Sequence, residues 1–227
     1  MRDEQSLSNR DALLLGAKKC LLEKGYNRTT ARDIAAVAGV SLAAIGYHFS
    51  SKEALLTEAL LLAFGEWDQD LQLALRSAVP AGLDPAKRFE AIWEKIMATF
   101  ETHRALWVAN FEIFAQMVAQ PAARGSIASK LHAARAGLAA MFLNQDEGTV
   151  DDRTVRTIGT LLHVLLSGLV LQWLMDPASA LSAKSLTDAL RDISTELGPI
   201  RKKSAVRPKN RAGKRPGKSA MLSKLSD

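Results

Sequence analysis

The sequence predicts an all-α protein in which a small N-terminal three-helix domain is joined to a larger C-terminal helical domain. Apolar residues recur at helical spacing along most of the 227 residues. The seven prolines lie outside those stretches, and runs of β-branched residues are few. Hydrophobic residues make up 48% of the chain and charged residues 24%, which is typical of a folded globular protein rather than a disordered one.

The first expected helix follows a short disordered lead, residues 1–8. Asn9 or Asp11 is predicted to cap this helix, because short polar side chains accept hydrogen bonds from the free N–H groups of a first turn. The apolar positions of the helix fall on one face, and Gly25 ends it as a C-terminal cap.

Two shorter helices follow, joined by a tight turn. Thr30 and Asp33 have the spacing of a capping box, which opens the second helix. Gly39 ends that helix at a turn where the backbone needs angles that side chains disfavour. Ser41 is predicted to cap a third helix that runs through Phe49.

The rest of the chain is predicted to form long helices and a tail. Ser50 and Glu53 have the spacing of a second capping box, which opens a helix to about Leu75. Further helices are expected over residues 85–102, 104–119, 121–143, 149–175 and 178–197. Residues 199–227 hold ten Lys or Arg and one acid with little apolar content, so we expect a disordered basic tail there.

Composition argues against several classes of protein. The single cysteine, Cys20, excludes an internal disulfide and a Cys-rich zinc site. The N-terminus lacks an apolar signal-peptide core, and the most apolar segment, residues 161–175, is shorter than the roughly 20 residues of a membrane span. The sequence also lacks a metal-ligand spacing, a phosphate-binding loop and a nucleophile–base pair. We therefore expect a cytoplasmic protein that is not an enzyme, uses no metal or other cofactor and binds no membrane.

Residues 29–55 have the pattern of a DNA-binding helix-turn-helix. The helix after Ser41 presents small outward residues, which let its backbone approach the floor of the major groove. Helix starts offer N–H groups to phosphates, and nearby cations and hydroxyls add phosphate donors. The residues predicted to contact DNA are Arg28, Thr29, Thr30, Arg32, Ser41, Leu42, Ala43, Ala44, Gly46, Tyr47, His48 and Lys52. The alternative is a three-helix packing unit with no DNA role, in which these residues are caps or solvated surface.

The same segment resembles the N-terminal domain of the TetR family of bacterial repressors. The shared features are Gly25-Tyr26, Thr29-Thr30, Asp33-Ile34-Ala35, Ala38-Gly39-Val40-Ser41, Tyr47-His48-Phe49 and Ser51-Lys52-Glu53-Ala54-Leu55. The sequence departs from the family at Ala43, where Gly or a small polar residue is usual, and at Gly46, where an aromatic residue is common. The resemblance implies a DNA-binding domain at residues 9–52 and a helical ligand-binding and dimerisation domain at residues 53–198.

Aromatic and Met residues in the larger domain are candidates for a ligand cavity. They recur at i, i+4 and i+7 on two successive helices. The resemblance implies a cavity among these helices for a small apolar or amphipathic ligand of unknown identity. The candidate lining residues are Trp93, Met97, Phe100, His103, Trp107, Phe111, Phe114 and Phe142. An ordinary hydrophobic core is the alternative explanation of the same pattern.

The predicted helix at residues 149–175 is apolar around most of its girth. A helix that is apolar on two faces is buried on two sides, which here are its own domain and a second subunit. Gly159 and Gly168 would allow close approach of another helix. The resemblance implies that the last two helices form a dimer interface, for which the candidates are Leu162, Leu165, Leu169 and Trp173. A core helix of a single chain is the alternative.

Together these patterns predict a ligand-responsive repressor that binds a palindromic double-stranded DNA operator as a homodimer. DNA and ligand would oppose each other through linkage. Two other hypotheses stay open at this point: a helical ligand carrier or enzyme with a vestigial head, and an architectural DNA binder driven by the basic tail. They differ in operator preference and in whether binding survives removal of residues 199–227.

Overall fold

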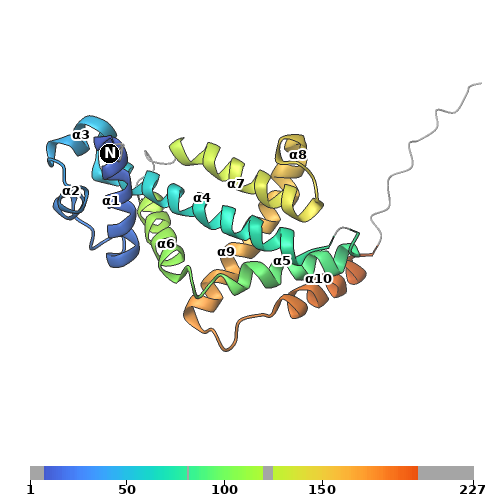
Figure 1. Ribbon diagram of the computed structural model, residues 1–227. Coiled ribbons are helices and arrows are strands. Elements are labelled where there is room, and N and C mark those ends of the chain that lie inside the picture. The colour runs from blue at the N-terminus through green and yellow to red at the C-terminus, as the bar shows by residue number, and fades with distance from the viewer. Residues whose placement is uncertain (1–7, 81, 120–124, 199–227) are drawn as a thin grey trace, which may run out of the picture.

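A computed structural model of the chain describes residues 8–80, 82–119 and 125–198 (Figure 1). Every regular element in those ranges is helical, which confirms the all-α prediction. The predicted basic tail and residues 1–7 of the predicted lead lie outside the described residues. The α-helices are α1 (Asn9–Lys24), α2 (Ala31–Ala38), α3 (Ala43–Phe49), α4 (Lys52–Ala78), α5 (Pro85–Ala98), α6 (Arg104–Ala119), α7 (Gly125–Leu143), α8 (Asp152–Thr154), α9 (Thr160–Met175) and α10 (Ala183–Leu197). Two other short turns are η2 (Glu147–Thr149) and the π-helical η3 (Val155–Gly159).

The molecule divides into a head, formed by α1 to α3, and a body, formed by α5 to α10, with α4 running from one into the other (Figure 1). α1 packs against α2 and α4. Two ion pairs add to this contact: Arg10 with Glu58, and Lys18 with Glu66, both at 2.5 Å. α6 reaches from the body to α1. The head is therefore attached to the body through both α4 and α6.

The core of the head is apolar and closely packed. Leu13 and Leu21 on α1 are fully buried against Ile34 on α2, and Phe49 on α3 closes the cluster. Gly16 lets α1 approach α2, because a Cβ there would lie 3.2 Å from the Cβ of Ala38. This packing fixes the angle between the helices, and so it fixes the surface that α3 presents.

The caps of α2 agree with the sequence. Thr30 accepts a hydrogen bond from the Asp33 N–H, and the Asp33 carboxylate accepts one from the Thr30 N–H, so the predicted capping box is confirmed. Gly39 ends the helix in the left-handed region, with a φ of 67°. Gly25 ends α1 with a φ of 81°. Both glycines lie where a Cβ would strain the backbone.

Two predicted caps in the head are wrong by a residue or two. Ser8, rather than Asn9 or Asp11, caps α1 by accepting the Asp11 N–H. α3 begins at Ala43, and the residue before it, Leu42, is already helical with a φ of −58°. Ser41 therefore contributes its carbonyl oxygen, which accepts the Ala44 N–H, and no side-chain cap.

The starts of two longer helices also differ from the prediction. Ser51, rather than Ser50, caps α4 by accepting the Ala54 N–H, because Ser50 has a positive φ of 67° and lies outside the helix. The last helix begins at Ala183 with Ser182 as its cap, five residues later than expected. Several adjacent serines and a short loop offered more than one competent cap, and spacing alone did not separate them.

The body has an aromatic core. Trp93 on α5 and Phe100 after it are 0% and 2% exposed, and α10 covers α5 from the other side. The Trp67 indole N–H on α4 donates to Thr99 Oγ1 at 2.9 Å, which fixes α4 to the end of α5. These contacts hold α4 rigidly along the body.

α8, η3 and α9 form one helical run over residues 152–175. At Gly159 it touches α7 so closely that a Cβ would overlap the carbonyl oxygen of Arg135. By length and composition, this run is the one helix among the described residues that could cross a membrane, with 28% of its most apolar window buried. Core helices of soluble proteins pass the same test, and one face of α9 does pack against α6 and α7.

Candidate functional site

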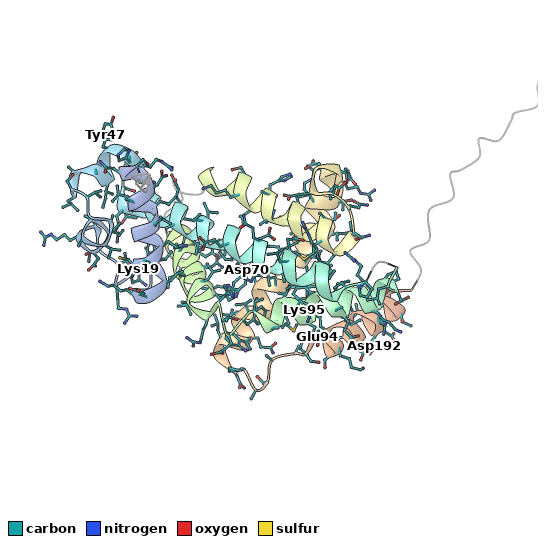
Figure 2. The ribbon with its side chains drawn as sticks, in the orientation of Figure 1. Lys19, Tyr47, Asp70, Glu94, Lys95 and Asp192 are labelled. Carbon is teal, nitrogen blue, oxygen red and sulfur yellow. The ribbon has the colours of Figure 1, made fainter. Side chains whose placement is uncertain are left out.

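The outer tip of the head presents Tyr47 on α3. Its side chain is 86% exposed and points away from the molecule (Figure 2). Ala43 and Gly46 lie exposed on the same short helix, and the space around a Cβ at Gly46 is open. Leu42 is 49% exposed beside them. The side chains around Tyr47 are small, and the helix lies at the outer tip of the head. A protruding helix with small outward side chains has the shape that enters a major groove.

Most of the residues predicted to contact DNA lie at the surface of the head. The exposed ones are Arg28, Thr30, Arg32, Ser41, Leu42, Ala43, Gly46 and Tyr47. Ala44 and His48 are partly buried, and the His48 ring packs edge-on against the Tyr47 ring at 4.8 Å between centroids. Through this contact His48 supports the orientation of the Tyr47 ring.

The structure gives two of the predicted contacts, Thr29 and Lys52, internal partners. Thr29 is 1% exposed, and its hydroxyl donates to the carbonyl oxygens of Cys20 and Gly25. The Lys52 ammonium donates to the Thr29 carbonyl oxygen at 3.3 Å and lies 5.6 Å from the centre of the Tyr26 ring. Both side chains thus hold the loop between α1 and α2 against the start of α4.

The head is positively charged. Residues 9–52 hold seven Lys or Arg and three acids, whereas residues 53–198 hold twelve and eighteen. Within the head, Lys24 and then Thr30 hydrogen-bond the Asp33 carboxylate and hold its pKa well below its usual range. Asp33 therefore stays ionised as the fixed partner of the α2 capping box, and the side chains of Arg28 and Arg32 are exposed.

A cavity of about 410 Å³ lies in the body beside α4. Its walls come from α4, α6, α7, η2 and α9. The lining residues are Thr57, Leu60, Leu61, Phe64, Gly65, Trp67, Asp68, Trp107, Asn110, Ile113, Phe114, Lys130, Leu131, Ala133, Ala134, Gly137, Leu138, Met141, Glu147, His163, Leu166 and Ser167. The size and the largely apolar lining are those of a small-molecule site.

Two of the eight predicted pocket residues, Trp107 and Phe114, line this cavity. Trp93 and Phe142 instead pack together with Phe89 in a separate cluster, with ring centroids 5.1 to 6.2 Å apart. Phe100 packs against Trp107 and Trp173. The remaining three also lie outside the lining: Met97 and Phe111 are partly buried against the core, and His103 Nδ1 lies 3.2 Å from the Thr99 carbonyl oxygen.

The sequence analysis missed the walls that α4 and α7 contribute. Phe64 and Trp67 on α4 form edge-to-face pairs with Trp107 at centroid distances of 5.3 and 5.2 Å. The sequence signal was present, because these two aromatics also recur at i and i+3 on an amphipathic helix. It could not be assigned to a cavity without knowing which face of α4 meets α6.

Glu112 on α6 connects the body to the head. Its carboxylate accepts the Tyr26 N–H at 2.6 Å and the Asn27 side-chain amide at 3.3 Å, and it lies beside Gly25. It therefore satisfies the hydrogen-bond donor of the backbone in the turn that follows α1. In the sequence, Glu112 is the lone acid in the apolar run of residues 105–119, which is the signal that could have identified it.

α9 leaves an apolar face exposed. Leu161, Val164, Leu171 and Met175 are 54%, 59%, 46% and 79% exposed, with Gly168 among them. These positions are spaced by three and four residues and form one stripe. Of the predicted interface residues, Leu162 and Leu169 are buried in the chain's own core, and Leu165 and Trp173 are partly buried.

No group of three or more His, Cys, Asp or Glu side chains that could hold a metal ion occurs in the described ranges. The buried Cys20 thiol has its pKa raised by burial.

Comparison with known families identifies the chain. Residues 13–59 match the TetR family of bacterial regulatory proteins. Residues 85–198, half of the chain, match the C-terminal domain of BetI-type transcriptional repressors. The chain belongs to the TetR family. The first match contains the helix-turn-helix of α2 and α3, and the second contains most of the cavity wall and the exposed face of α9.

Curated relatives of this TetR-family chain are repressors. It is 32% identical over 114 residues to the HTH-type transcriptional repressor KstR2 of Mycobacterium tuberculosis, covering 50% of this chain and 55% of that protein. It is 42% identical over 48 residues to the HTH-type transcriptional repressor BepR of Brucella suis, covering 21% and 23%. The chain thus spans about half the length of KstR2 and about a quarter of the length of BepR.

Solved structures of TetR-like proteins match over most of the chain. A transcriptional regulator from Pseudomonas aeruginosa is 26% identical, with 87% of this chain and 93% of that one covered and a TM-score of 0.57. The multidrug binding protein EbrR, complexed with imidazole, is 22% identical, with 88% and 98% covered and the same TM-score. At that identity the second likeness shows the fold alone.

Proposed function

We propose that the protein is a ligand-responsive repressor that binds a two-fold-symmetric DNA operator as a homodimer in the cytoplasm. The observation that carries this proposal is the tip of the head: a protruding helix with small outward residues and a Tyr47 that is 86% exposed, on a domain with an excess of four positive charges. An exposed tyrosine hydroxyl can donate to a phosphate, and Arg28 and Arg32 add charge at the edge of the same surface.

The exposed stripe on α9 supports dimerisation. Apolar side chains that stay half exposed along one helix face cost free energy until another surface covers them. A second copy of the chain offers the same stripe, and a two-fold axis makes such a contact self-complementary. We therefore assign the interface to Leu161, Val164, Gly168, Leu171 and Met175, one face away from Leu162 and Leu169.

The cavity supports control by a ligand because its walls carry the contacts that hold the head. On α6, Asn110 and Ile113 line the cavity while Glu112 binds the turn after α1. On α4, the cavity-lining Leu61 and Gly65 neighbour Glu58 and Glu66, which pair with α1. A ligand that shifts α4 or α6 would move both heads relative to each other, and so would change their fit to successive major grooves.

The test is selection of bound sequences from random duplex DNA with the full-length protein and with a variant that ends at Gly198. A two-fold-symmetric site enriched by both supports the proposal. Enrichment by neither, or binding only when residues 199–227 are present, overturns it and favours a ligand carrier or a tail-driven DNA binder respectively.

Substitutions in the head test the surface itself. Tyr47→Ala and Arg32→Ala should each lower affinity for the selected site by roughly 5- to 150-fold, the effect of losing one charge-assisted or buried hydrogen bond. Lys19→Ala is the matched control, because Lys19 is an exposed cation on α1 away from Tyr47 (Figure 2). Equal losses in Lys19→Ala and Arg32→Ala would indicate general charge attraction in place of a docked α3.

A further inference from the structure

The cavity contains one polar side chain that is almost wholly buried, Asn110 on α6. It is 8% exposed and lines the cavity, and its amide has no hydrogen-bond partner among the described residues. Its amide atoms are not fully covered by protein atoms, so they are open to the cavity, and native proteins pair nearly all such polar groups with protein, water or ligand. An unsatisfied amide on a cavity wall is therefore a group that a ligand would satisfy.

Aromatic side chains line the cavity together with Asn110. Trp107 lies one turn earlier on α6, and Phe64 and Trp67 face it from α4. The polar side chains of α9 that line the cavity are His163 and Ser167, and the Ser167 hydroxyl already donates to the His163 carbonyl oxygen at 2.9 Å. Burial, and then the charge of Arg135, lower the pKa of His163, so the imidazole is neutral at pH 7.

The cavity also has three charged lining residues, Asp68, Lys130 and Glu147. Glu147 is exposed, whereas burial raises the pKa of the Asp68 carboxyl, which follows Trp67 on α4. Lys130 lies on α7, about 20 Å along the helix from its end at Leu143, which Glu147 follows. Lys130 is opposite in sign to Asp68 and Glu147, so a charged ligand of either sign meets a like charge as well as an opposite one.

We propose that the cavity binds an uncharged, largely apolar ring compound that carries one hydrogen-bonding oxygen, and that Asn110 recognises that oxygen. This inference rests on the proposed function, since it assigns the chemistry of the effector site. The Asn110 amide donates to a ketone or hydroxyl oxygen, and the aromatic walls cover the rings. A hydrocarbon of the same shape leaves the amide unsatisfied and binds more weakly.

The experiment is equilibrium dialysis of the full-length protein against 9-fluorenone and against fluorene. The two share a ring skeleton, and only the ketone accepts a hydrogen bond. We expect fluorenone to bind more tightly by roughly 5- to 150-fold, the effect of one buried hydrogen bond. Equal affinities, tighter binding of fluorene, or no binding of either compound overturns the proposal.

The variant that assigns the effect is Asn110→Leu, which replaces the amide by an apolar group of similar size. Its preference for fluorenone should fall to within about twofold, because fluorene gains what fluorenone loses. Gln69→Leu makes the same type of change on an exposed position of α4 outside the cavity and should keep the wild-type preference. A preference that survives in Asn110→Leu contradicts the assignment to Asn110.

A cationic probe tests the alternative that the cavity binds a charged ligand. If proflavin binds more tightly than fluorenone and Asp68→Asn abolishes that binding, the cavity selects charge and the proposal is wrong. None of these readouts needs DNA. If the protein selects an operator but does not prefer fluorenone, only this inference is wrong. If it prefers fluorenone but selects no operator, only the proposed function is wrong.

Discussion

The head and the body are both helical, but they differ in the sign of their net charge and in where their small and aromatic side chains lie. Residues 9–52 carry an excess of four positive charges and place small residues outward, whereas residues 53–198 carry an excess of six negative charges and place aromatic residues inward. The head must fit a partner of fixed shape, so its caps, turns and small side chains are tightly specified. The body must enclose a cavity and present an apolar stripe on α9, and many different apolar sequences can do both.

The sharpest way to break this comparison is to remove the proposed dimer contact on α9. Leu161→Glu with Val164→Glu places two charges on the exposed stripe of α9. We expect monomers by analytical ultracentrifugation and a loss of operator affinity of about 100-fold or more, because one head then binds without the other. Leu73→Glu is the control, since Leu73 is 64% exposed on α4. A dimer that persists in the double variant would move the interface elsewhere.

The second test strains the body and leaves the head intact. In Gly159→Ala the added Cβ overlaps the Arg135 carbonyl oxygen, and the neighbour is backbone that cannot turn away. We expect a loss of about 1–3 kcal/mol in the free energy of unfolding, measured by tryptophan fluorescence in denaturant. All four tryptophans lie outside residues 9–52, so this signal reports the body. Gly65→Ala, with open space at the Cβ, should unfold at or above the wild-type midpoint.

The third test loosens the head from the body. Glu112→Gln keeps the shape of the side chain and removes its charge, so the bond to the Tyr26 N–H becomes a neutral one. The expected cost is about 1 kcal/mol. Hydrogen exchange of the amides near residue 26 should quicken, while exchange in α9 stays unchanged. Glu101→Gln, an exposed acid before α6, is the control. Unchanged exchange near residue 26 would show that α4 alone carries the head.

The smallest expected effect is on the acid stability of the head. Because the folded-state pKa of Asp33 is depressed, its contribution is present above the unfolded value of about 4 and is lost as pH falls below it. The protection of the α2 amides against hydrogen exchange, taken relative to the intrinsic exchange rate at each pH, should therefore fall between about pH 4 and pH 2. Asp33→Asn should show faster exchange at neutral pH and a flatter pH profile, whereas Asp70→Asn on α4 should match the wild type (Figure 2). Parallel profiles for all three proteins would remove Asp33 from the acid response.

The head could be predicted closely because local chemistry decides it. The capping box of Thr30 with Asp33 and the positive φ angles of Gly25 and Gly39 follow from the residues themselves. The errors arose where neighbouring serines compete as caps, as at Ser50 and Ser51. Burial of Thr29 and the internal contacts of Lys52 could not be foreseen, because they depend on how the α1–α2 turn meets α4.

The body could be predicted only in outline. α9 is apolar around most of its circumference, so its sequence gives little direction to the core, and the inward Leu162 could not be told from the outward Leu161. Aromatic spacing found two helices that carry rings, yet Trp93 joined one cluster and Trp107 the cavity. Such a division depends on which helices pack together, and that is a long-range property.

The separation of charge between head and body also affects how the molecule meets its target. DNA is a line of negative charge, so it attracts residues 9–52 and repels residues 53–198 before any contact forms, while the basic residues 199–227 attract it as well. The head and this C-terminal segment therefore both favour encounters with DNA over the acidic residues between them. This bias acts on the association rate, and it fades as added salt shortens the range of the field to about 10 Å at 0.1 M.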